Sequence, residues 1–167
     1  GLATVYGLMT GCIIHTTLIA FGVSEIIKRN ESLFFTIKLL GAAYLLYLAY
    51  QVFKSNSDIV FSTDNVQQKS TSQLFKTGFW MNVLNPKVTI FFLAFFPQFL
   101  FSEEISTVIQ FYVLGGLFIL VSFIVFSSIA LLAGSVSSFI KENKKAGVFL
   151  KWLQIVVFVG IAFLIMK

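Results

Sequence analysis

The sequence has few of the residues that soluble domains and metal sites use. It contains one cysteine, one histidine and seven acidic residues among 167. A single cysteine excludes a disulfide framework and a paired-cysteine metal site within the chain. Charged residues make up 11% of the sequence, whereas a soluble domain carries about 25%. The composition therefore predicts a membrane protein rather than a domain that folds in water.

Several nucleotide-binding and catalytic motifs are also absent. The sequence has no G-x-x-x-x-G-K-[ST] phosphate loop, so direct coupling to ATP by this chain is not expected. It has no H-E-x-x-H or G-x-S-x-G motif. We therefore expect neither an enzyme nor a bound cofactor or metal. The formal net charge of +5 suits an anionic membrane surface rather than a nucleic acid.

The apolar residues are grouped into segments long enough to cross a bilayer, which takes about 20 residues as a helix. Five such helices are predicted, at 1–24, 32–53, 77–101, 108–134 and 147–166. Charged or polar turns are expected at 25–31, 102–106 and 135–147, and a long exposed loop at 54–73. The predicted fold is an all-α, polytopic membrane bundle in one transmembrane domain, 1–167.

The positive charges predict how this bundle is oriented. Segment 54–76 carries three lysines and segment 141–151 carries four, whereas the opposite side has only Lys28, Arg29 and Lys167. Lysine and arginine concentrate on the cytoplasmic side of membrane proteins. The long loop at 54–73 is therefore predicted to be cytoplasmic.

Five spans are an odd number for a symmetric carrier. Residues 37–40 weakly match residues 150–153, in helices whose predicted directions are opposite. Inverted repeats of this kind are common in secondary transporters. We therefore expect a 3+3 inverted repeat with one further span upstream, and we interpret the start at Gly1 as an N-terminal truncation.

The third predicted span is interrupted at its centre by Asn85, Pro86 and Lys87. Proline in a helix removes one backbone hydrogen bond and clashes with the preceding turn. In hydrocarbon, the freed backbone groups need another partner or a wet cavity. Such a break can bind the carboxylate or ammonium of a substrate, or it can be a kink that only shapes packing. We take it as the main candidate for a substrate site.

Further candidates come from the polar residues around the break. Asn82, Asn85 and Thr89 share one stripe of an ideal helix, whereas Lys87 points away from it and would need the kink to approach them. A lysine at the bilayer centre costs about 2.5–3.5 kcal/mol, and Lys87 is too deep to reach the headgroups easily. Lys38 is shallower and could extend outward. The predicted substrate-binding residues are Asn82, Asn85, Pro86, Lys87, Lys38 and Thr89.

His15 is the candidate for proton coupling. It lies near the middle of the first span, and histidine is the side chain that ordinarily titrates between pH 5 and 8. All seven acidic residues fall in predicted loops. The alternative is a neutral histidine hydrogen-bonded to a neighbouring helix. Gly7 and Gly11 share its face and predict close helix packing, and such glycine faces could also serve a homodimer.

Three stretches are informative together. They are GLMTG at 7–11 followed by His15, KLLGAAYL at 38–45, and NVLNPK at 82–87 followed by FFPQF at 95–99. In order and spacing they resemble the lysine exporter / homoserine-threonine resistance (LysE/RhtB) family of amino-acid exporters. Members of that family normally begin with another helix, which carries a Pro-Gly-Pro stretch and a nearby acidic residue and which this sequence does not contain.

The resemblance implies a multi-pass efflux carrier in the bacterial inner membrane. Its expected substrates are amino acids of the threonine, homoserine or lysine type, or related small metabolites. Carriers of this family are thought to be driven by the proton gradient, so protons are an expected partner. An exporter or channel of the same fold for a cation or another small solute is the alternative.

Overall fold

The computed structural model describes residues 1–55, 69–133 and 144–166, and every regular element in those ranges is a helix. The elements are α1 (Leu2–Leu18), the π-helix η1 (Ile19–Val23), α2 (Ser24–Arg29), α3 (Glu31–Lys54), α4 (Thr71–Val83), α5 (Pro86–Phe95), the 3-10 helix η2 (Phe96–Phe99), α6 (Thr107–Leu131) and α8 (Lys144–Met166).

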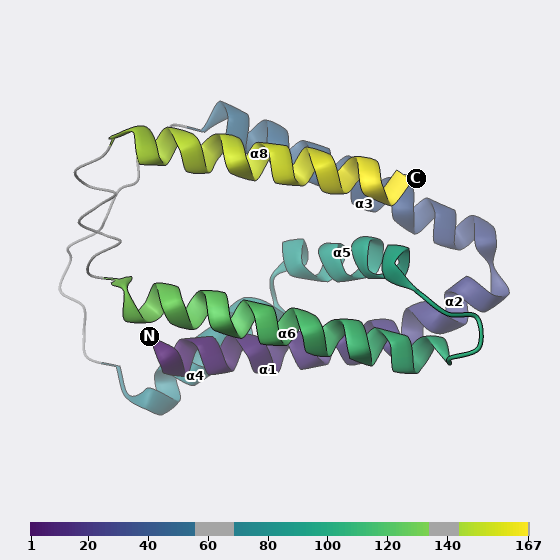
Figure 1. Cartoon of the computed structure of the whole chain (residues 1–167), viewed down its shortest axis with the longest axis horizontal. Helices are drawn as coiled ribbons and strands as arrows, with labels where there is room; N and C mark the ends of the chain where they lie inside the picture. Colours follow the sequence, from purple (N-terminus) through teal and green to yellow (C-terminus); the bar gives the residue numbers. More distant parts are fainter. Residues whose placement is uncertain (56–68, 134–143, 167) are drawn as a thin grey trace.

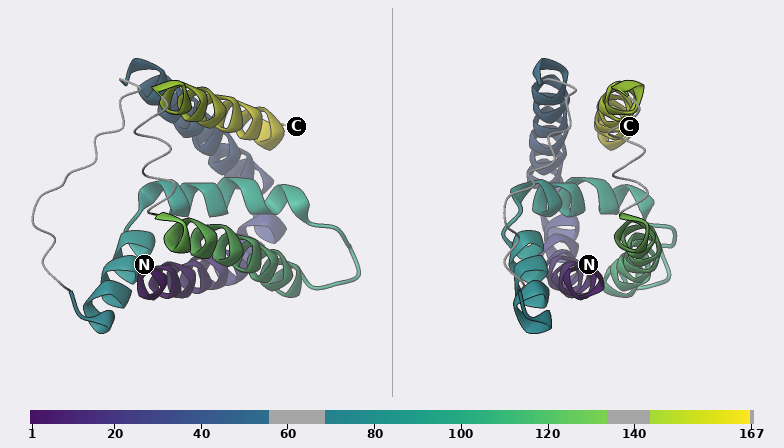
Figure 2. Two further views of the ribbon diagram at one scale, coloured as in Figure 1. Left: turned by 60° about the vertical axis from the view of Figure 1, so that its left-hand side comes forward. Right: turned by 90° about the vertical axis from the view of Figure 1, so that its left-hand side faces the viewer.

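These helices form two groups with α5 between them. Figure 1 shows α3 and α8 side by side in one group and α1, α4 and α6 in the other. The two further views in Figure 2 confirm that α5 lies between the groups. Helix α5 contacts α3 and α8 on one side and α1 on the other. The segment after the predicted break therefore joins the two groups.

The predicted membrane bundle is confirmed. Within the described ranges, four helices are long and apolar enough to cross a membrane: Leu2–Ile26, Glu31–Lys54, Thr107–Leu131 and Lys145–Met166. The pair Thr71–Val83 and Pro86–Phe99 meets the same criteria as one span bent by 53°. The inverted repeat, the sixth span and the orientation stay predictions.

Some predicted boundaries are wrong. The expected turn at 25–31 is helical up to Arg29, and only Asn30 separates α2 from α3. The side chain of Asn30 caps the start of α3 by accepting the Leu33 N–H at 2.9 Å, as an N-cap residue does. The loop predicted at 54–73 ends earlier, because Ser70 and Gln73 form a capping box that begins α4 at Thr71. Residues 56–68 and 134–143 lie outside the described part.

The turn at 102–106 is confirmed, and one buried side chain holds it. Gln110 is only 1% exposed. Its Oε1 accepts the N–H groups of Phe101 and Ser102, at 2.7 and 3.1 Å. Its Nε2 donates to the carbonyls of Ser102 and Ile105, at 2.7 Å each. All four are backbone groups of residues 101–105, so Gln110 fixes how η2 connects to α6.

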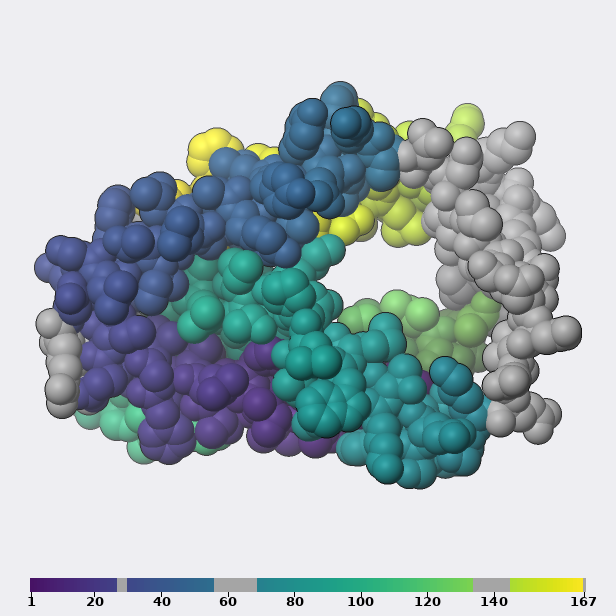
Figure 3. Space-filling model, turned by 180° about the vertical axis from the view of Figure 1, so that it is seen from behind, coloured from purple at the N-terminus to yellow at the C-terminus, as the bar shows by residue number. Residues whose placement is uncertain are grey.

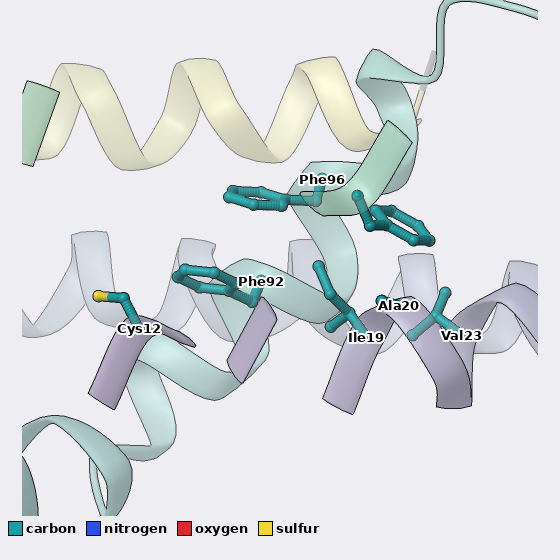
Figure 4. Close-up of a cluster of buried hydrophobic side chains, with 7 residues drawn as sticks. Cys12, Ile19, Ala20, Val23, Phe92 and Phe96 are labelled. Atoms are coloured by element: carbon teal, nitrogen blue, oxygen red, sulfur yellow. The ribbon is translucent and has the colours of Figure 1, made fainter. Parts of the chain in front are cut away.

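Helix α1 packs closely against α4, as the glycine spacing predicts. A Cβ atom on Gly7 would overlap the carbonyl oxygen of Phe75, and one on Gly78 would overlap that of Thr4. The two backbones are therefore in contact at these positions, which only glycine permits. Further along, a buried apolar cluster connects α1 and η1 to α5, η2 and α6 (Figure 4). Its members are Cys12, Ile19, Ala20, Val23, Phe92, Phe96 and Phe111.

This contact predicts that Gly78→Leu destabilises the protein. The new side chain would meet the α1 backbone, which cannot move aside, and overpacking typically costs about 1–3 kcal/mol. We expect the thermal unfolding midpoint in detergent to fall by about 2–12 °C, since 1 kcal/mol shifts it by about 2–4 °C at this chain size. The control is Gly116→Leu, at a site with open space around it. Equal midpoints for the two variants would contradict the contact.

Candidate functional site

The break between α4 and α5 is closed by Asn85. Asn85 adopts an extended conformation, with φ −84° and ψ 106°, which the following proline favours. Its side-chain Oδ1 accepts the Lys87 N–H at 3.0 Å. Its carbonyl accepts the N–H groups of Val88 and Thr89, at 3.1 and 3.2 Å. Because Pro86 has no N–H, Asn85 satisfies the whole first turn of α5, and a ligand there would have to be bound by side chains.

His15 satisfies the carbonyl that the proline leaves without its partner. In a continuous helix, the Asn82 carbonyl would accept the N–H of residue 86, which is proline. It accepts instead from the Asn85 N–H at 3.1 Å and from His15 Nε2 at 3.2 Å. A carbonyl can only accept, so His15 Nε2 carries the hydrogen. His15 is 3% exposed, and its ring lies 5.5 Å from that of Phe92.

The Asn82 side chain also faces α1. It is 7% exposed, and its Nδ2 donates to Cys12 Sγ at 3.4 Å. A Cβ atom on Gly11 would lie 2.6 Å from its Oδ1, which is buried with no partner among the described residues. Asn82 therefore lies in the α1–α4 interface. The single stripe predicted for Asn82 and Thr89 does not continue as one face, because the span bends by 53° between them.

Lys87 extends from the break toward α8. Its Nζ lies 5.4 Å from the centroid of the Phe158 ring, a distance at which an ammonium is attracted by the ring face. The lysine is half-buried, and among the described residues no carboxylate pairs with it. Thr89 is less free to bind a ligand, because its Oγ1 donates to the Asn85 carbonyl at 3.3 Å.

Lys38 is not brought to the break. Its Nζ lies 6.0 Å from the Phe34 ring, one turn earlier on the same helix. Gly41, one turn further along α3, packs against the side chain of Ala94. At 1.5 Å per residue, Ala94 is about 12 Å along α5 from Pro86. A substrate role for Lys38 stays a prediction and would need a ligand at another point on the path.

The break lies beside open space. A pocket of about 490 Å³ is lined by Thr77, Trp80, Met81, Leu84, Asn85 and Pro86. The space-filling view in Figure 3 also shows an opening between the α3–α8 pair and α6, and the N-terminal end of α5 borders it. Within 1–55, 69–133 and 144–166, no three His, Cys, Asp or Glu side chains gather closely enough to hold a metal ion.

Comparison of the sequence with known proteins identifies its family. The model of the LysE type translocator family matches residues 1–167. The chain belongs to the LysE type translocator family. This confirms the resemblance that the stretches around His15, Lys38 and Asn85 indicate.

Two curated relatives are named homoserine/homoserine lactone efflux protein. The one from Salmonella typhi is 34% identical over 143 residues, which cover 86% of this chain and 68% of that protein. The one from Salmonella typhimurium is 33% identical over 144 residues, with 86% and 69% covered. A membrane protein of Bacillus subtilis is 36% identical over 110 residues, 60% of this chain and 51% of that protein. No solved structure gives a significant match.

Sequence reasoning missed two contacts of this translocator's candidate site. Phe158 has no local signal, because it is one of 21 phenylalanines and its contact with Lys87 depends on how α5 and α8 pack. Cys12 taken alone indicates only a small buried apolar group. Its position one turn before His15 puts both side chains on one face of α1, and that spacing could have indicated a shared partner.

The His15 bond predicts a coupling between His15 and Pro86. Replacing His15 by Phe leaves the Asn82 carbonyl with the Asn85 N–H as its remaining donor, and the loss of one hydrogen bond costs about 0.5–1.5 kcal/mol. In a Pro86→Ala background, residue 86 regains an N–H that can serve the Asn82 carbonyl. We therefore expect His15→Phe to cost about half as much unfolding free energy there, measured by a double-mutant cycle in detergent.

The matched control for this cycle is Pro97→Ala, which alters the other proline of the chain. In that background the cost of His15→Phe should equal its cost in the unmodified protein. Strict additivity of His15→Phe and Pro86→Ala would show that the ring does not compensate for the proline.

Proposed function

We propose that this protein is a secondary exporter that moves amino acids or related small metabolites out of the cell across the bacterial inner membrane, coupled to protons. Its membership of a translocator family supports transport, and the names of the Salmonella relatives support efflux of homoserine-type compounds. The observation that carries the proposal is the break at Asn85 and Pro86, within a bent membrane span and beside an opening.

The side chains of the break suit a substrate carboxylate. Asn85 uses its Oδ1 to cap α5, and its Nδ2 has no hydrogen-bond partner in the described part of the chain. The Lys87 ammonium lies at the same break and contacts only an aromatic ring among those residues. An amide donor and a cation can bind one carboxylate together, and charge-assisted hydrogen bonds are about twice as strong as neutral ones.

Phe158 positions Lys87 in this proposal. The ring face attracts the ammonium without neutralising it, so the charge stays available to an incoming anion. A carboxylate in place of Phe158 would pair with the lysine and compete with the substrate. The contact also links α5 to α8, so a shift of Lys87 on substrate binding would change the packing of α5 against α8.

His15 is proposed as the proton-coupling residue, acting beside the break rather than on the substrate. Its Nε2 donates to the Asn82 carbonyl whether the ring is neutral or cationic, because protonation occurs at Nδ1. Proton uptake would therefore keep the bond and add a positive charge next to the α4–α5 junction. Such a charge can bias the junction between two arrangements, which is what coupling requires.

Transport by purified protein in proteoliposomes tests the substrate site. We expect counterflow of homoserine or threonine, and a fall in initial rate of at least about tenfold for Lys87→Gln, since a hydrogen bond to a charged group contributes about 1.5–3 kcal/mol. Lys76→Gln, which removes an exposed lysine on α4, is the control and should transport normally.

Two results would contradict the substrate site. One is the absence of counterflow for homoserine, threonine, lysine and arginine alike. The other is a Lys87→Gln rate equal to that of Lys76→Gln. Counterflow of an inorganic cation instead of these amino acids would favour the alternative, an exporter or channel for cations.

The proton role is tested with His15→Gln, which retains an N–H donor for the Asn82 carbonyl but does not titrate. We expect substrate exchange without a gradient to continue, because the break is still supported. Acceleration by an imposed pH gradient should be lost. If the gradient accelerates His15→Gln as much as the unmodified protein, the proton is carried elsewhere and His15 serves only to hold the break.

A further inference from the structure

Aromatic and cationic side chains meet where α3 ends and α8 begins, far along the chain from the break. Lys151 Nζ donates to the Ser55 carbonyl at 2.6 Å and lies 5.8 Å from the Phe53 ring centroid. The Phe53 ring packs edge-on against Trp152, with centroids 6.1 Å apart. Tryptophan and tyrosine concentrate at membrane–water interfaces. This end of the α3–α8 pair is therefore expected at the level of the lipid headgroups.

A surface pocket of about 400 Å³ lies at this end, lined by Tyr47, Tyr50, Gln51, Lys54 and Ser55. Its volume is within the range of small-ligand pockets, about 300–1,000 Å³. The first four lining residues recur at intervals of three and four along α3, so they share one helix face. The tyrosines lie toward the membrane-spanning part of α3 and Lys54 is its last residue. The pocket therefore passes from aromatic walls to a cationic rim.

The pocket offers hydrogen-bond donors that the described residues do not use. Gln51 Nε2 donates one hydrogen to the Tyr47 hydroxyl and keeps a second. The Tyr50 hydroxyl and the Lys54 ammonium have no hydrogen-bond or ionic partner in the part of the chain that the structure describes. Among the described residues, no carboxylate lines the pocket. One positive charge together with neutral donors is a set that suits a phosphate, whose oxygens are strong acceptors.

The surrounding sequence has the matching charge. Segments 54–76 and 141–151 together contain seven lysines and three acidic residues, a net charge of +4. A cluster of basic residues next to a membrane span attracts anionic lipids. Lys151 is not free to bind in the same way, because it is bonded to the Ser55 carbonyl. It holds one wall of the pocket in place, and Lys54 is left as the cation that faces a ligand.

We propose that this pocket binds the phosphate of an anionic phospholipid headgroup. Lys54 supplies the charge, Tyr50 and Gln51 donate hydrogen bonds, and the tyrosine rings contact the glycerol and the first carbons of the acyl chains. A free phosphate ion shares the headgroup chemistry. The aromatic walls and the interfacial position favour the lipid, since a soluble ion gains nothing from them. The proposal is independent of the transported substrate.

The test uses the two tryptophans of the chain, Trp80 and Trp152. Replacing Trp80 by Phe leaves as the sole tryptophan fluorophore Trp152, whose ring packs against Phe53, the neighbour of Lys54 in the chain. The full chain is placed in membranes that mix brominated phosphatidylglycerol with unlabelled phosphatidylcholine. In a second series the phosphatidylcholine is brominated and the phosphatidylglycerol is unlabelled. Because bromine quenches tryptophan only at short range, the two titrations give the relative affinity of the site near Trp152 for the anionic lipid.

We expect phosphatidylglycerol to be preferred about fivefold, the size expected for one lysine at an anionic surface. Lys54→Gln should remove most of this preference, and Tyr50→Phe should reduce it. Lys76→Gln is the control, because Lys76 lies on the same side but outside the pocket, and it should leave the preference unchanged. A thermal unfolding midpoint in detergent equal to that of the Trp80→Phe parent shows that each variant is folded.

Three results would overturn the proposal. The first is equal quenching by the two brominated lipids in the parent protein. The second is an equal effect of Lys54→Gln and Lys76→Gln, which would indicate diffuse attraction by the whole basic surface. The third is displacement of the brominated lipid by millimolar inorganic phosphate, which would assign the pocket to the free ion. Loss of counterflow in Lys87→Gln bears only on the export site and leaves this test unaffected.

Discussion

The hydrogen bond from His15 to the Asn82 carbonyl is the interaction that connects α1 to the break, beside the Asn85 N–H that the same carbonyl accepts. A proline in a span removes one amide hydrogen, and Asn82 is buried in the α1–α4 interface, so a protein group has to replace it. The carbonyl that loses its partner is that of Asn82, and the ring of His15 reaches it from another helix at 3.2 Å. Asn85 satisfies the amides on the other side of the break. The Asn82 carbonyl and the first amides of α5 therefore have partners without a ligand, while Asn85 lines the pocket beside the break and Lys87 extends toward Phe158.

The rest of α1 is built to bring His15 to that position. Gly7 and Gly78 let the α1 and α4 backbones touch. This close packing brings the His15 ring within hydrogen-bond distance of the Asn82 carbonyl on α4. Beyond the histidine, the π-helix at Ile19–Val23 packs its buried residues against Phe92 and Phe96, on the other half of the broken span. One helix thus contacts both sides of the break. In a protein of the LysE type translocator family, this arrangement holds the two halves of the proposed substrate site through one common neighbour.

Local chemistry decides how much of this could be predicted from the sequence. The break at Pro86 was predictable, because a proline between an asparagine and a lysine is not compatible with a regular apolar span. The close packing at Gly7 was predictable from spacing alone. The turn expected at 25–31 was wrong, because charged residues such as Glu25 are tolerated in a helix that has reached the membrane surface. Lys87 and Phe158 are 71 positions apart in the sequence. The residue pattern within either helix could not predict their contact, because it depends on how α5 packs against α8. For His15 the sequence left two roles open; the structure shows the bond to a neighbouring helix, and the proton role remains a proposal.

The central claim is that the break at membrane depth is open to water. Thiol accessibility measures this most directly, because alkylation requires a hydrated thiolate. Asn85→Cys and Leu120→Cys would be compared in native membranes with a charged, membrane-impermeant maleimide, the unmodified protein reporting on the buried Cys12. Leu120 lies exposed within α6, on a surface that a bilayer would cover. We predict rapid labelling at position 85, slowed by bound substrate, and little labelling at position 120. Labelling at position 85 as slow as at position 120 would contradict the account.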